Sequence, residues 1–385
     1  MVYEKQGIVA MIPLFSTHVP KLAGEEVKKL IESGWLNRGK KVELFEQLFM
    51  RTFGCDYALS LNSCTSTLRL AYDIAKSTAL EDKRINPEVI TTPYTMVATN
   101  TALLECRIRP IFVDIEYETI NINPDDIESN ITDDTIAIVG VDYAGLSCDW
   151  NKINRIAKKY DLIVIQDAAQ ALGAKYCGSD ISKWTDMTCY SFQAIKHITT
   201  GDGGMFVTVN PSIAELAKRK IWFGIDRNAR TQTELGTIFP DIMTLGFKYA
   251  MNDVAATMGI EGLKDLKWIL KCRAEIAKQY REELMGVKDL LPIQYDGDKM
   301  ESANWLFPIH VKRRSKFAKK MRSMGIEVAV HNWRNDLYGV FYNSKTSELK
   351  NVQKVNDDLI HIPLHAELTQ EQVDYIIKAI KGLRW

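Results

Sequence analysis

The chain has 385 residues, which exceeds the length of one ordinary core and is sufficient for two unequal domains. Its 49 basic and 49 acidic residues give a formal net charge of zero, so the composition points neither to a nucleic-acid partner nor to an anionic membrane surface. Recognition of a ligand must therefore depend on local groups of residues.

The cysteine pattern indicates reduced thiols rather than disulfides or a zinc site. The sequence contains no CxxC pair and no tight Cys/His spacing, and residues 1–6 lack the charged-then-apolar pattern of a signal peptide. No apolar run approaches the roughly 20 residues of a membrane span. We therefore expect a cytoplasmic protein with no membrane segment and no bound metal. The seven cysteines are Cys55, Cys64, Cys106, Cys148, Cys177, Cys189 and Cys272.

Residues 55–210 alternate short β-rich runs with helical patterns. This alternation predicts βα units around a mostly parallel sheet. Helices do not follow every run with the regularity of a barrel, so we expect an α/β fold built on a large, open, seven-stranded sheet. The predicted strands are Tyr57–Leu61, Val89–Thr92, Ile111–Asp114, Ile136–Val141, Leu162–Gln166, Thr188–Phe192 and Met205–Val209.

The pattern changes after Tyr280, where we expect a smaller α/β domain. Trp305–Val311 and Glu327–Val330 are predicted strands on either side of a basic helix at residues 316–322. A final amphipathic helix is predicted over Thr369–Lys381, with Thr369 as its N-cap.

The two predicted domains are joined by a helix rather than by a flexible linker. Glu261–Leu284 reads as helical and contains no proline and no glycine after Gly262. We therefore predict a large cofactor-binding domain over residues 1–262, including the N-terminal segment, and a small C-terminal domain over residues 263–385.

A lysine and an aspartate lie where an open sheet would bind a ligand. Lys196 follows the apolar lead-in Ser191-Phe192, which would desolvate its amine and lower its pKa, so it is a candidate Schiff-base former. Asp167 follows the predicted strand Leu162–Gln166, at the tip where such sheets bind ligands. Pyridoxal 5'-phosphate (PLP) requires this pair: an amine to hold its aldehyde and a carboxylate to keep its pyridine nitrogen protonated. The pair predicts a PLP enzyme, although each residue alone is more often a surface lysine or a turn residue.

A phosphate site is expected at the segment Asn62–Leu68, which follows the first predicted strand and opens a helix. Backbone N–H groups at a helix start, together with the helix dipole, favour a phosphate. An ordinary Ser/Thr cap is the competing interpretation of this segment alone. The presence of Asp167 and Lys196 in the same sheet favours the phosphate.

Other residues near the predicted site have two interpretations each. Gln170 is a candidate partner for the ring hydroxyl of the cofactor, and His197 is as consistent with a structural role as with acid–base work. The glycines of residues 201–204 predict a tight turn, because they do not fit GxGxxG and a strand rather than a helix follows them. Most of the large aromatic residues are predicted to be core or interface residues, as is usual for such side chains; they are Trp35, Trp222, Tyr249, Trp305 and Trp333.

Seven short segments, spread over nearly the whole chain, carry a family resemblance together. They are Ser33-Gly34-Trp35-Leu36-Asn37-Arg38-Gly39, Thr95-Met96-Val97-Ala98-Thr99, Val113-Asp114-Ile115, Asp142-Tyr143-Ala144-Gly145, Gln166-Asp167-Ala168-Ala169-Gln170, Ser191-Phe192-Gln193-Ala194-Ile195-Lys196 and Ile362-Pro363-Leu364-His365. In this order they resemble the DegT/StrS family of PLP-dependent nucleotide-sugar aminotransferases. The resemblance implies the aspartate-aminotransferase-like fold, PLP fold type I.

The resemblance also implies a role for each matching position. Lys196 corresponds to the lysine that binds the cofactor covalently, Asp167 to the partner of the pyridine nitrogen, and Gln170 to the residue at the ring hydroxyl. The cofactor-phosphate positions are Cys64, Thr65 and Ser191.

The chain departs from the family pattern at several positions, one of which is Phe223-Gly224, where His-Gly is frequent. Cys64 stands where glycine is common, and Met96 stands where many members place an aromatic ring over the cofactor, so we expect a thioether contact there. Lys248 replaces a frequent asparagine in the segment 246–253, which resembles the one that a second subunit inserts to complete the phosphate site. A homodimer with shared active sites is therefore implied.

The implied reaction is the transfer of an amino group from L-glutamate to a keto sugar carried on a nucleoside diphosphate. Asp142-Tyr143-Ala144-Gly145 looks more like members that act at C4 of a 4-keto-6-deoxy hexose than like those that act at C3. A 3-dehydratase of the same fold is a rival, but in that branch a histidine replaces the lysine, so Lys196 argues against it. A catalytically idle regulatory homologue is the rival from another class; Lys196, Asp167 and Gln170 together argue against it.

Overall fold

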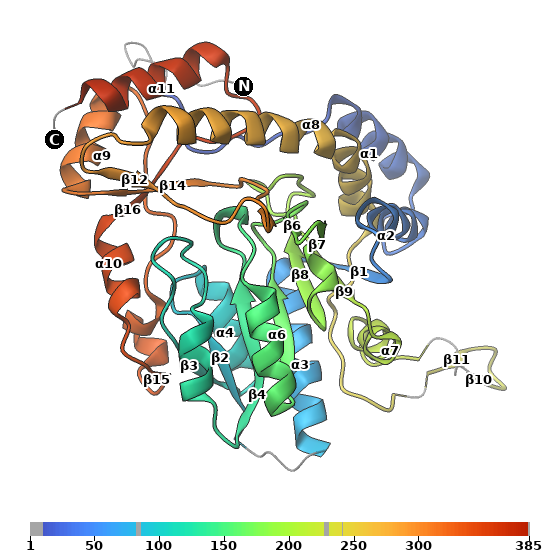
Figure 1. The fold of residues 1–385 in the computed structure, drawn as a ribbon. Coiled ribbons are helices and arrows are strands. Elements are labelled where there is room, and N and C mark those ends of the chain that lie inside the picture. The colour runs from blue at the N-terminus through green and yellow to red at the C-terminus, as the bar shows by residue number, and fades with distance from the viewer. Residues whose placement is uncertain (1–10, 82–85, 227–230, 241, 384–385) are drawn as a thin grey trace.

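The structure is a computed structural model that describes residues 11–81, 86–226, 231–240 and 242–383 (Figure 1). A large sheet with helices on both faces forms its centre, and a second, smaller sheet lies under the C-terminal helices (Figure 1). No helix within the described ranges is long and apolar enough to cross a membrane.

The central sheet has eight strands, so the expectation of seven was wrong by one. All seven predicted runs are present, and the eighth strand is a two-residue segment that pairs in parallel with β3 at the sheet's edge. Its residues are exposed and polar, and so they carry no hydrophobic pattern. The strand order is β1 (Tyr57–Leu61), β9 (Gly204–Thr208), β8 (Met187–Ser191), β5 (Ile163–Asp167), β4 (Thr135–Val141), β2 (Glu88–Thr91), β3 (Arg109–Phe112) and β15 (Lys345–Thr346).

The sheet is mostly parallel, as predicted, because only β9 runs against its neighbours β1 and β8. Every residue of β4 is buried, which is typical of a strand covered on both faces. Helices α3 (Cys64–Glu81), α4 (Val97–Glu105) and α7 (Pro211–Lys220) cover one face. Helices α2 (Lys40–Phe53), α6 (Trp150–Tyr160) and part of α8 (Asp253–Leu284) cover the other.

Helix α8 is the predicted bridging helix, and it begins earlier than expected, after the N-cap Asn252. Its interior glycines are explained by packing: a Cβ at Gly259 would lie 2.6 Å from the ring of Phe45 on α2. Helix α8 runs along the top of the molecule from α1 (Lys21–Ser33) and α2 to α11 (Gln370–Gly382) (Figure 1). It therefore contributes to the cores of both the large and the small sheet.

The smaller sheet consists of β12 (Leu290–Pro292), β14 (Phe307–Val311) and β16 (Leu359–Ile362), all antiparallel. Helix α9 (Arg314–Ser323), α11 and the end of α8 pack on it. Thr369 caps α11 in a capping box with Gln372, so the predicted N-cap is confirmed. The domain division after residue 262 remains a prediction. Ile12, near the N-terminus, packs in this C-terminal core.

The predicted strand Glu327–Val330 was wrong. Residues 326 and 329 form only isolated bridges, Ile326 with Ile12 and Ala329 with His361. The ladder ends after one residue on each side, because the chain then turns toward the central sheet, where Asn335 N–H donates to Pro93 O at 2.8 Å.

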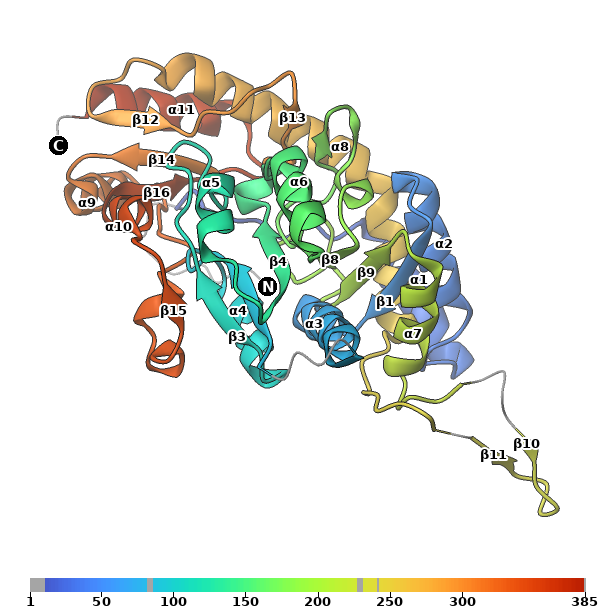
Figure 2. The ribbon, with the colours of Figure 1, turned by 60° about the horizontal axis from the view of Figure 1, so that its bottom comes forward.

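The remaining elements are short. They are α5 (Pro124–Ile127), α10 (Lys350–Asp358), a three-stranded sheet of β13 (Met300–Glu301), β6 (Lys175–Tyr176) and β7 (Ser179–Asp180), and a hairpin of β10 (Thr231–Gln232) and β11 (Ile238–Phe239). The hairpin projects far from the rest of the molecule (Figure 2).

Gly204, the first residue of β9, is where the sheet meets the start of α3. A Cβ there would lie 2.6 Å from Ser63 O and 2.8 Å from Cys64 N. Because both atoms belong to the backbone, we predict that Gly204→Ala lowers the free energy of unfolding by roughly 1–3 kcal/mol in urea titrations. Gly24→Ala in α1 is the control, since no atom lies within 4 Å of a Cβ there and alanine is the better helix former. Equal stability of the two variants would show that α3 is not held against β9.

Candidate active site

The carboxyl ends of several central strands meet at one edge of the sheet. Leu61 of β1 and Ser191 of β8 are both register partners of Gly204, which lies on β9 between them. Asp167, the last residue of β5, pairs with Cys189 of β8. The register therefore brings together the start of α3, Ser191 and Asp167, as the sequence predicted for a ligand-binding edge.

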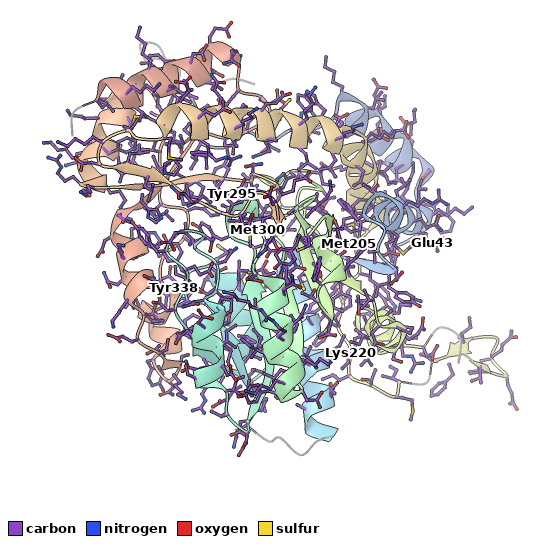
Figure 3. The ribbon with its side chains drawn as sticks, viewed as in Figure 1. Glu43, Met205, Lys220, Tyr295, Met300 and Tyr338 are labelled. Carbon is purple, nitrogen blue, oxygen red and sulfur yellow. The ribbon has the colours of Figure 1, made fainter. Side chains whose placement is uncertain are left out.

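A segment of the C-terminal part lies over this edge of the sheet. Residues 293–306 pack against residues of the strand ends and of the Lys196 loop, including Tyr143 and Ile195. Figure 3 shows Tyr295 and Met300 of this segment between the central sheet and α8. The edge is therefore enclosed by residues that are far from it in sequence.

The N-terminus of α3 presents free backbone donors. Ser63 caps the helix: its Oγ accepts from Ser66 N–H at 3.1 Å and its carbonyl accepts from Thr67 N–H at 3.2 Å. The next N–H groups, those of Cys64 and Thr65, belong to the first turn and have no partner within the helix. The Ser/Thr cap and a phosphate site are thus compatible, because the cap uses other groups. Cys64 is buried and Thr65 is exposed, so backbone N–H groups and the Thr65 hydroxyl are the groups that could donate to a phosphate.

Asp167 is a buried carboxylate held by neutral donors. Its side chain is 4% exposed, Oδ2 accepts from Thr99 Oγ1 at 2.7 Å, and Oδ1 accepts from Ala169 N–H at 3.0 Å. Burial raises the pKa of Asp167, and the bonds from Thr99 and Ala169 and the charge of Lys196 oppose that rise. A cation placed next to this carboxylate would therefore be strongly favoured.

Thr99 is a site residue that sequence reasoning missed. It lies on α4, and its hydroxyl also contacts that of Thr95 at 3.0 Å. The two threonines are four residues apart at the start of a helix, but a buried Thr pair gives no signal without knowledge of what faces it. The segment 95–99 was identified only through the family resemblance.

Gln170 is oriented by a backbone contact. Its Oε1 accepts from Ala144 N–H at 2.7 Å, and the side chain is buried. Because the oxygen is engaged there, the NH2 group is the end that remains to donate to a ligand such as a ring hydroxyl. This geometry fits the predicted role, which no further observation tests.

Lys196 lies on the loop between β8 and β9. The loop is closed by bonds from Phe192 N–H to Gly203 O and from Thr200 N–H to Phe192 O, both at 2.9 Å. Strand β9 follows its glycines directly, so the expectation that a strand rather than a helix follows them is confirmed. Burial lowers the pKa of Lys196 to about 8, while Cys64 and Asp167 act in the opposite direction. The amine lies 3.7 Å from the ring centroid of Trp305. Lys196 is half-buried, and the lowered pKa of its amine agrees with the predicted desolvation.

His197 has a structural role. Its Nε2 lies 2.9 Å from Ala303 O and the side chain is buried. Burial lowers its pKa to about 3, so the ring is neutral at physiological pH. The acid–base interpretation of His197 is not supported.

Other predicted site residues lie around the same edge. Met96 is 52% exposed as the N-cap of α4, so it is not a core residue, and contact with the cofactor face stays a prediction. Ser191 is buried, and its Oγ accepts from Gln193 N–H at 3.3 Å. Lys248 is exposed, and the next residue, Tyr249, accepts from Asn62 N–H at 2.7 Å, beside the start of α3.

The residues present fit PLP. Lys196 supplies an amine with a lowered pKa, Asp167 a buried carboxylate that favours a cation, and the start of α3 the N–H donors for a phosphate. The described residues contain no group of three or more His, Cys, Asp or Glu side chains arranged to hold a metal ion.

Comparison with known sequences gives one family over most of the chain. The profile of the DegT/DnrJ/EryC1/StrS aminotransferase family matches residues 20–381. The uncharacterized protein MJ1066 of Methanocaldococcus jannaschii is 37% identical over 377 residues, which is 94% of this chain and 96% of that protein. The spore coat polysaccharide biosynthesis protein SpsC of Bacillus subtilis is 30% identical over 375 residues, or 93% of each.

Comparison with solved structures confirms the fold. The sugar aminotransferase CalS13 of Micromonospora echinospora superposes with a TM-score of 0.90 at 28% identity, covering 97% of this chain and 100% of that one. PseC of Helicobacter pylori, an aminotransferase involved in pseudoaminic acid biosynthesis, gives a TM-score of 0.85 at 26% identity over 96% and 98%. The PLP form of the putative sugar aminotransferase Spr1654 of Streptococcus pneumoniae gives 0.86 at 25% identity over 96% and 98%.

Asp167→Asn should keep the fold and lose most of the activity. A neutral amide cannot hold a proton on the pyridine nitrogen, so transamination should fall by about 100-fold or more. Steady-state rates measure the activity of the wild type and of the variant, and circular dichroism spectra verify that both are folded. Full turnover by the variant would show that Asp167 only ends a strand.

Thr99→Val should weaken PLP binding by roughly 10–100-fold, because it removes a hydrogen bond to a charged group. Without that bond the pKa of Asp167 rises further, so the loss of PLP on acidification should begin at a higher pH than in the wild type. Equilibrium dialysis across a pH series measures both effects. Thr99→Ser keeps the hydroxyl and serves as the control; a loss as large in Thr99→Ser would contradict the role given to the hydrogen bond.

Proposed function

Because the chain belongs to the DegT/DnrJ/EryC1/StrS family of PLP-dependent sugar aminotransferases, we propose that it transfers an amino group from L-glutamate to a keto sugar carried on a nucleoside diphosphate. The observation that carries this proposal is the placement of the half-buried Lys196, whose amine lies 3.7 Å from the Trp305 ring centroid, at the sheet edge where the carboxylate of Asp167 is buried. PLP, when bound, supplies the electron sink that an amino-group transfer requires.

Each residue of the site then has a defined task. Asp167 would stabilise positive charge on the pyridine nitrogen, and the N–H groups at the start of α3 would bind the phosphate. The NH2 group of Gln170, whose oxygen is engaged by Ala144 N–H, would orient the ring through its hydroxyl. These three groups would hold the cofactor at its nitrogen, its phosphate and its hydroxyl.

Lys196 has the properties of a proton-transfer group as well as of a covalent anchor. With a pKa of about 8, a substantial fraction of its amine is neutral near physiological pH, whereas an exposed lysine is almost entirely protonated. The efficiency of a general acid–base is greatest when its pKa lies near the working pH. We propose that the free Lys196 amine would remove and return the proton at the carbon that carries the transferred amino group.

The similar proteins support a sugar as the acceptor. CalS13 is a sugar aminotransferase, PseC takes part in pseudoaminic acid biosynthesis, and SpsC takes part in spore coat polysaccharide biosynthesis. We propose by analogy a nucleotide-linked 4-keto-6-deoxy hexose that is aminated at C4. The support for C4 is the sequence Asp142-Tyr143-Ala144-Gly145, whose Ala144 N–H orients Gln170.

The rival functions have less support. A C3 aminotransferase uses the same residues and differs only in how the sugar is presented. A 3-dehydratase would need a histidine in place of Lys196, and the neighbouring His197 cannot take that role because it is buried against Ala303 O.

A panel of nucleotide-linked keto sugars, each incubated with L-glutamate and PLP, tests this proposal. We expect a 4-keto-6-deoxy sugar to give an amino sugar, detected by mass spectrometry, with formation of 2-oxoglutarate. The nitrogen position is then read by NMR. Reactions with Lys196→Ala protein are the matched control. Nitrogen at C3, or loss of water without a gain of nitrogen, would support one of the rival functions instead.

We also propose a homodimer in which each subunit completes its neighbour's site. Five residues that precede the segment 246–253, which carries Lys248, have large exposed apolar side chains, which is unusual for a free surface. They are Leu235, Phe239, Ile242, Met243 and Leu245, with Leu235 88% exposed. The β10–β11 hairpin extends away from its own subunit, where a partner would meet it (Figure 2).

Mixing two inactive variants should restore activity if the sites are shared. Lys196→Ala lacks the amine, and Lys248→Glu would repel the cofactor phosphate in the neighbour's site. One hybrid site of the mixed dimer would contain both intact residues, so up to about half of the wild-type turnover per hybrid dimer should return. Native mass spectrometry verifies subunit exchange. No activity in a mixture with proven exchange would contradict shared sites.

We propose a cytoplasmic location on the basis of the thiols. All seven cysteines are free, and five of them are buried. Free thiols persist in a reducing compartment.

A further inference from the structure

The amine of Lys196 lies over the face of an indole ring. Its Nζ is 3.7 Å from the ring centroid of Trp305, whose side chain is completely buried. The prediction that Trp305 is a core residue was therefore correct, but its ring has one face against the proposed catalytic lysine. Asp167 and Cys64 also act on the amine electrostatically. Burial lowers the pKa of His197 and of His331, and the amine lowers both further. The ring centroid of His331 lies 4.8 Å from that of Trp305.

Trp305 is fixed at three points. Its backbone N–H donates to Ala144 O at 2.9 Å, and its carbonyl accepts from Arg273 Nη1 at 3.0 Å. Its Nε1–H donates to Ile195 O at 2.9 Å, so the ring is bonded to the residue that precedes Lys196. The ring can therefore not rotate away from the amine without breaking a hydrogen bond.

Residues 303–305 also connect the Lys196 loop and Gln170 to the indole ring through hydrogen bonds. Ala303 O lies 2.9 Å from His197 Nε2, and Ala303 N–H donates to Gly145 O at 2.9 Å. Ala144 joins the two ends of this network, because its carbonyl accepts from Trp305 and its N–H donates to Gln170. The indole, the lysine loop and Gln170 are thus parts of one rigid unit.

An indole face stabilises an ammonium group more than it stabilises a neutral amine. Tryptophan has the strongest such interaction of the aromatic residues, and the interaction strengthens when water is excluded. Burial acts on the Lys196 amine in the opposite direction, by lowering its pKa. The ring therefore offsets part of the free-energy cost of burying the ammonium group. A carboxylate in direct contact would do so more strongly, but it would keep the amine protonated.

We propose that Trp305 is a positioning residue whose indole face holds the free amine of Lys196 whenever the amine is not bound to the cofactor. This inference rests on the proposed function, because only an amine that is released from the cofactor in every catalytic cycle needs a defined position when it is free. The consequence is that the amine stays within reach of the reacting atoms and does not fold out into solvent.

The test replaces tryptophan by fluorinated analogues. Mono-, di- and trifluorotryptophan, incorporated through a tryptophan auxotroph, keep the shape and the N–H donor of the indole and weaken its negative face in steps. The readout is the rate at which the cofactor-free full chain captures PLP as a function of pH, followed by absorbance. Capture needs the neutral amine, so the midpoint of this profile reports the pKa of the amine.

We expect the midpoint to move to lower pH with each added fluorine, by about one pH unit in total. The chain contains eight tryptophans, so Trp305→Phe is the matched control: it keeps a ring face at this position, and fluorination of the other seven should leave its midpoint unchanged. A midpoint that does not move with fluorine in the wild type overturns the proposal. So does an equal movement in Trp305→Phe.

The experiment separates this inference from the proposed function, because PLP capture requires neither sugar nor glutamate. Capture that is equally fast in Lys196→Ala would show that PLP does not react at this lysine, and both proposals would fail. Capture by Lys196 with an unmoved midpoint would remove only the role of Trp305.

Discussion

The active site depends on the burial of one carboxylate. Asp167 lies at the end of a central strand, where every partner that the structure gives it is a neutral donor or the distant charge of Lys196. Burying a carboxylate without a cation in contact is costly. The site is therefore less stable than it would be with a cation present, and it favours a ligand that carries a proton on a flat aromatic nitrogen. The protein is therefore preorganised to bind this cofactor.

The sheet register explains why the other parts of the site are at the right place. Strand β9 runs against its neighbours and begins at Gly204, so the start of α3 and the end of β8 approach each other across a residue without a side chain. Two segments of the C-terminal part then close the edge. Trp305 packs against the lysine loop, and Asn335 donates from its side chain to Thr95 O at 3.0 Å, next to Met96. The C-terminal part of the chain thus contributes to the geometry of a site whose chemical groups lie on the large sheet and its loops.

Much of this arrangement was predictable because it leaves local signals. A strand buried on both faces is a run of apolar residues, a helix start has small hydroxylic side chains, and the lysine lies between an apolar approach and glycines. These signals gave seven strands, α3, Asp167 and Lys196.

The missed features have no local signal. Strand β15 is two exposed residues whose pairing with β3 is set entirely by the tertiary structure. Thr99 and Trp305 are ordinary core residues in the sequence, and their roles exist only because Asp167 and Lys196 face them. The false strand at Glu327–Val330 had the correct apolar pattern, but its neighbours allow only single bridges.

The central claim is that Lys196 is the lysine that binds PLP, and the most direct measurement is chemical trapping. The purified protein, loaded with PLP, is reduced with borohydride, digested and mapped by mass spectrometry. The account predicts a single phosphopyridoxyl group on the peptide that contains Lys196, and no yellow colour in Lys196→Ala protein. An adduct on another lysine would contradict the site, the proposed mechanism and the role of Trp305 together.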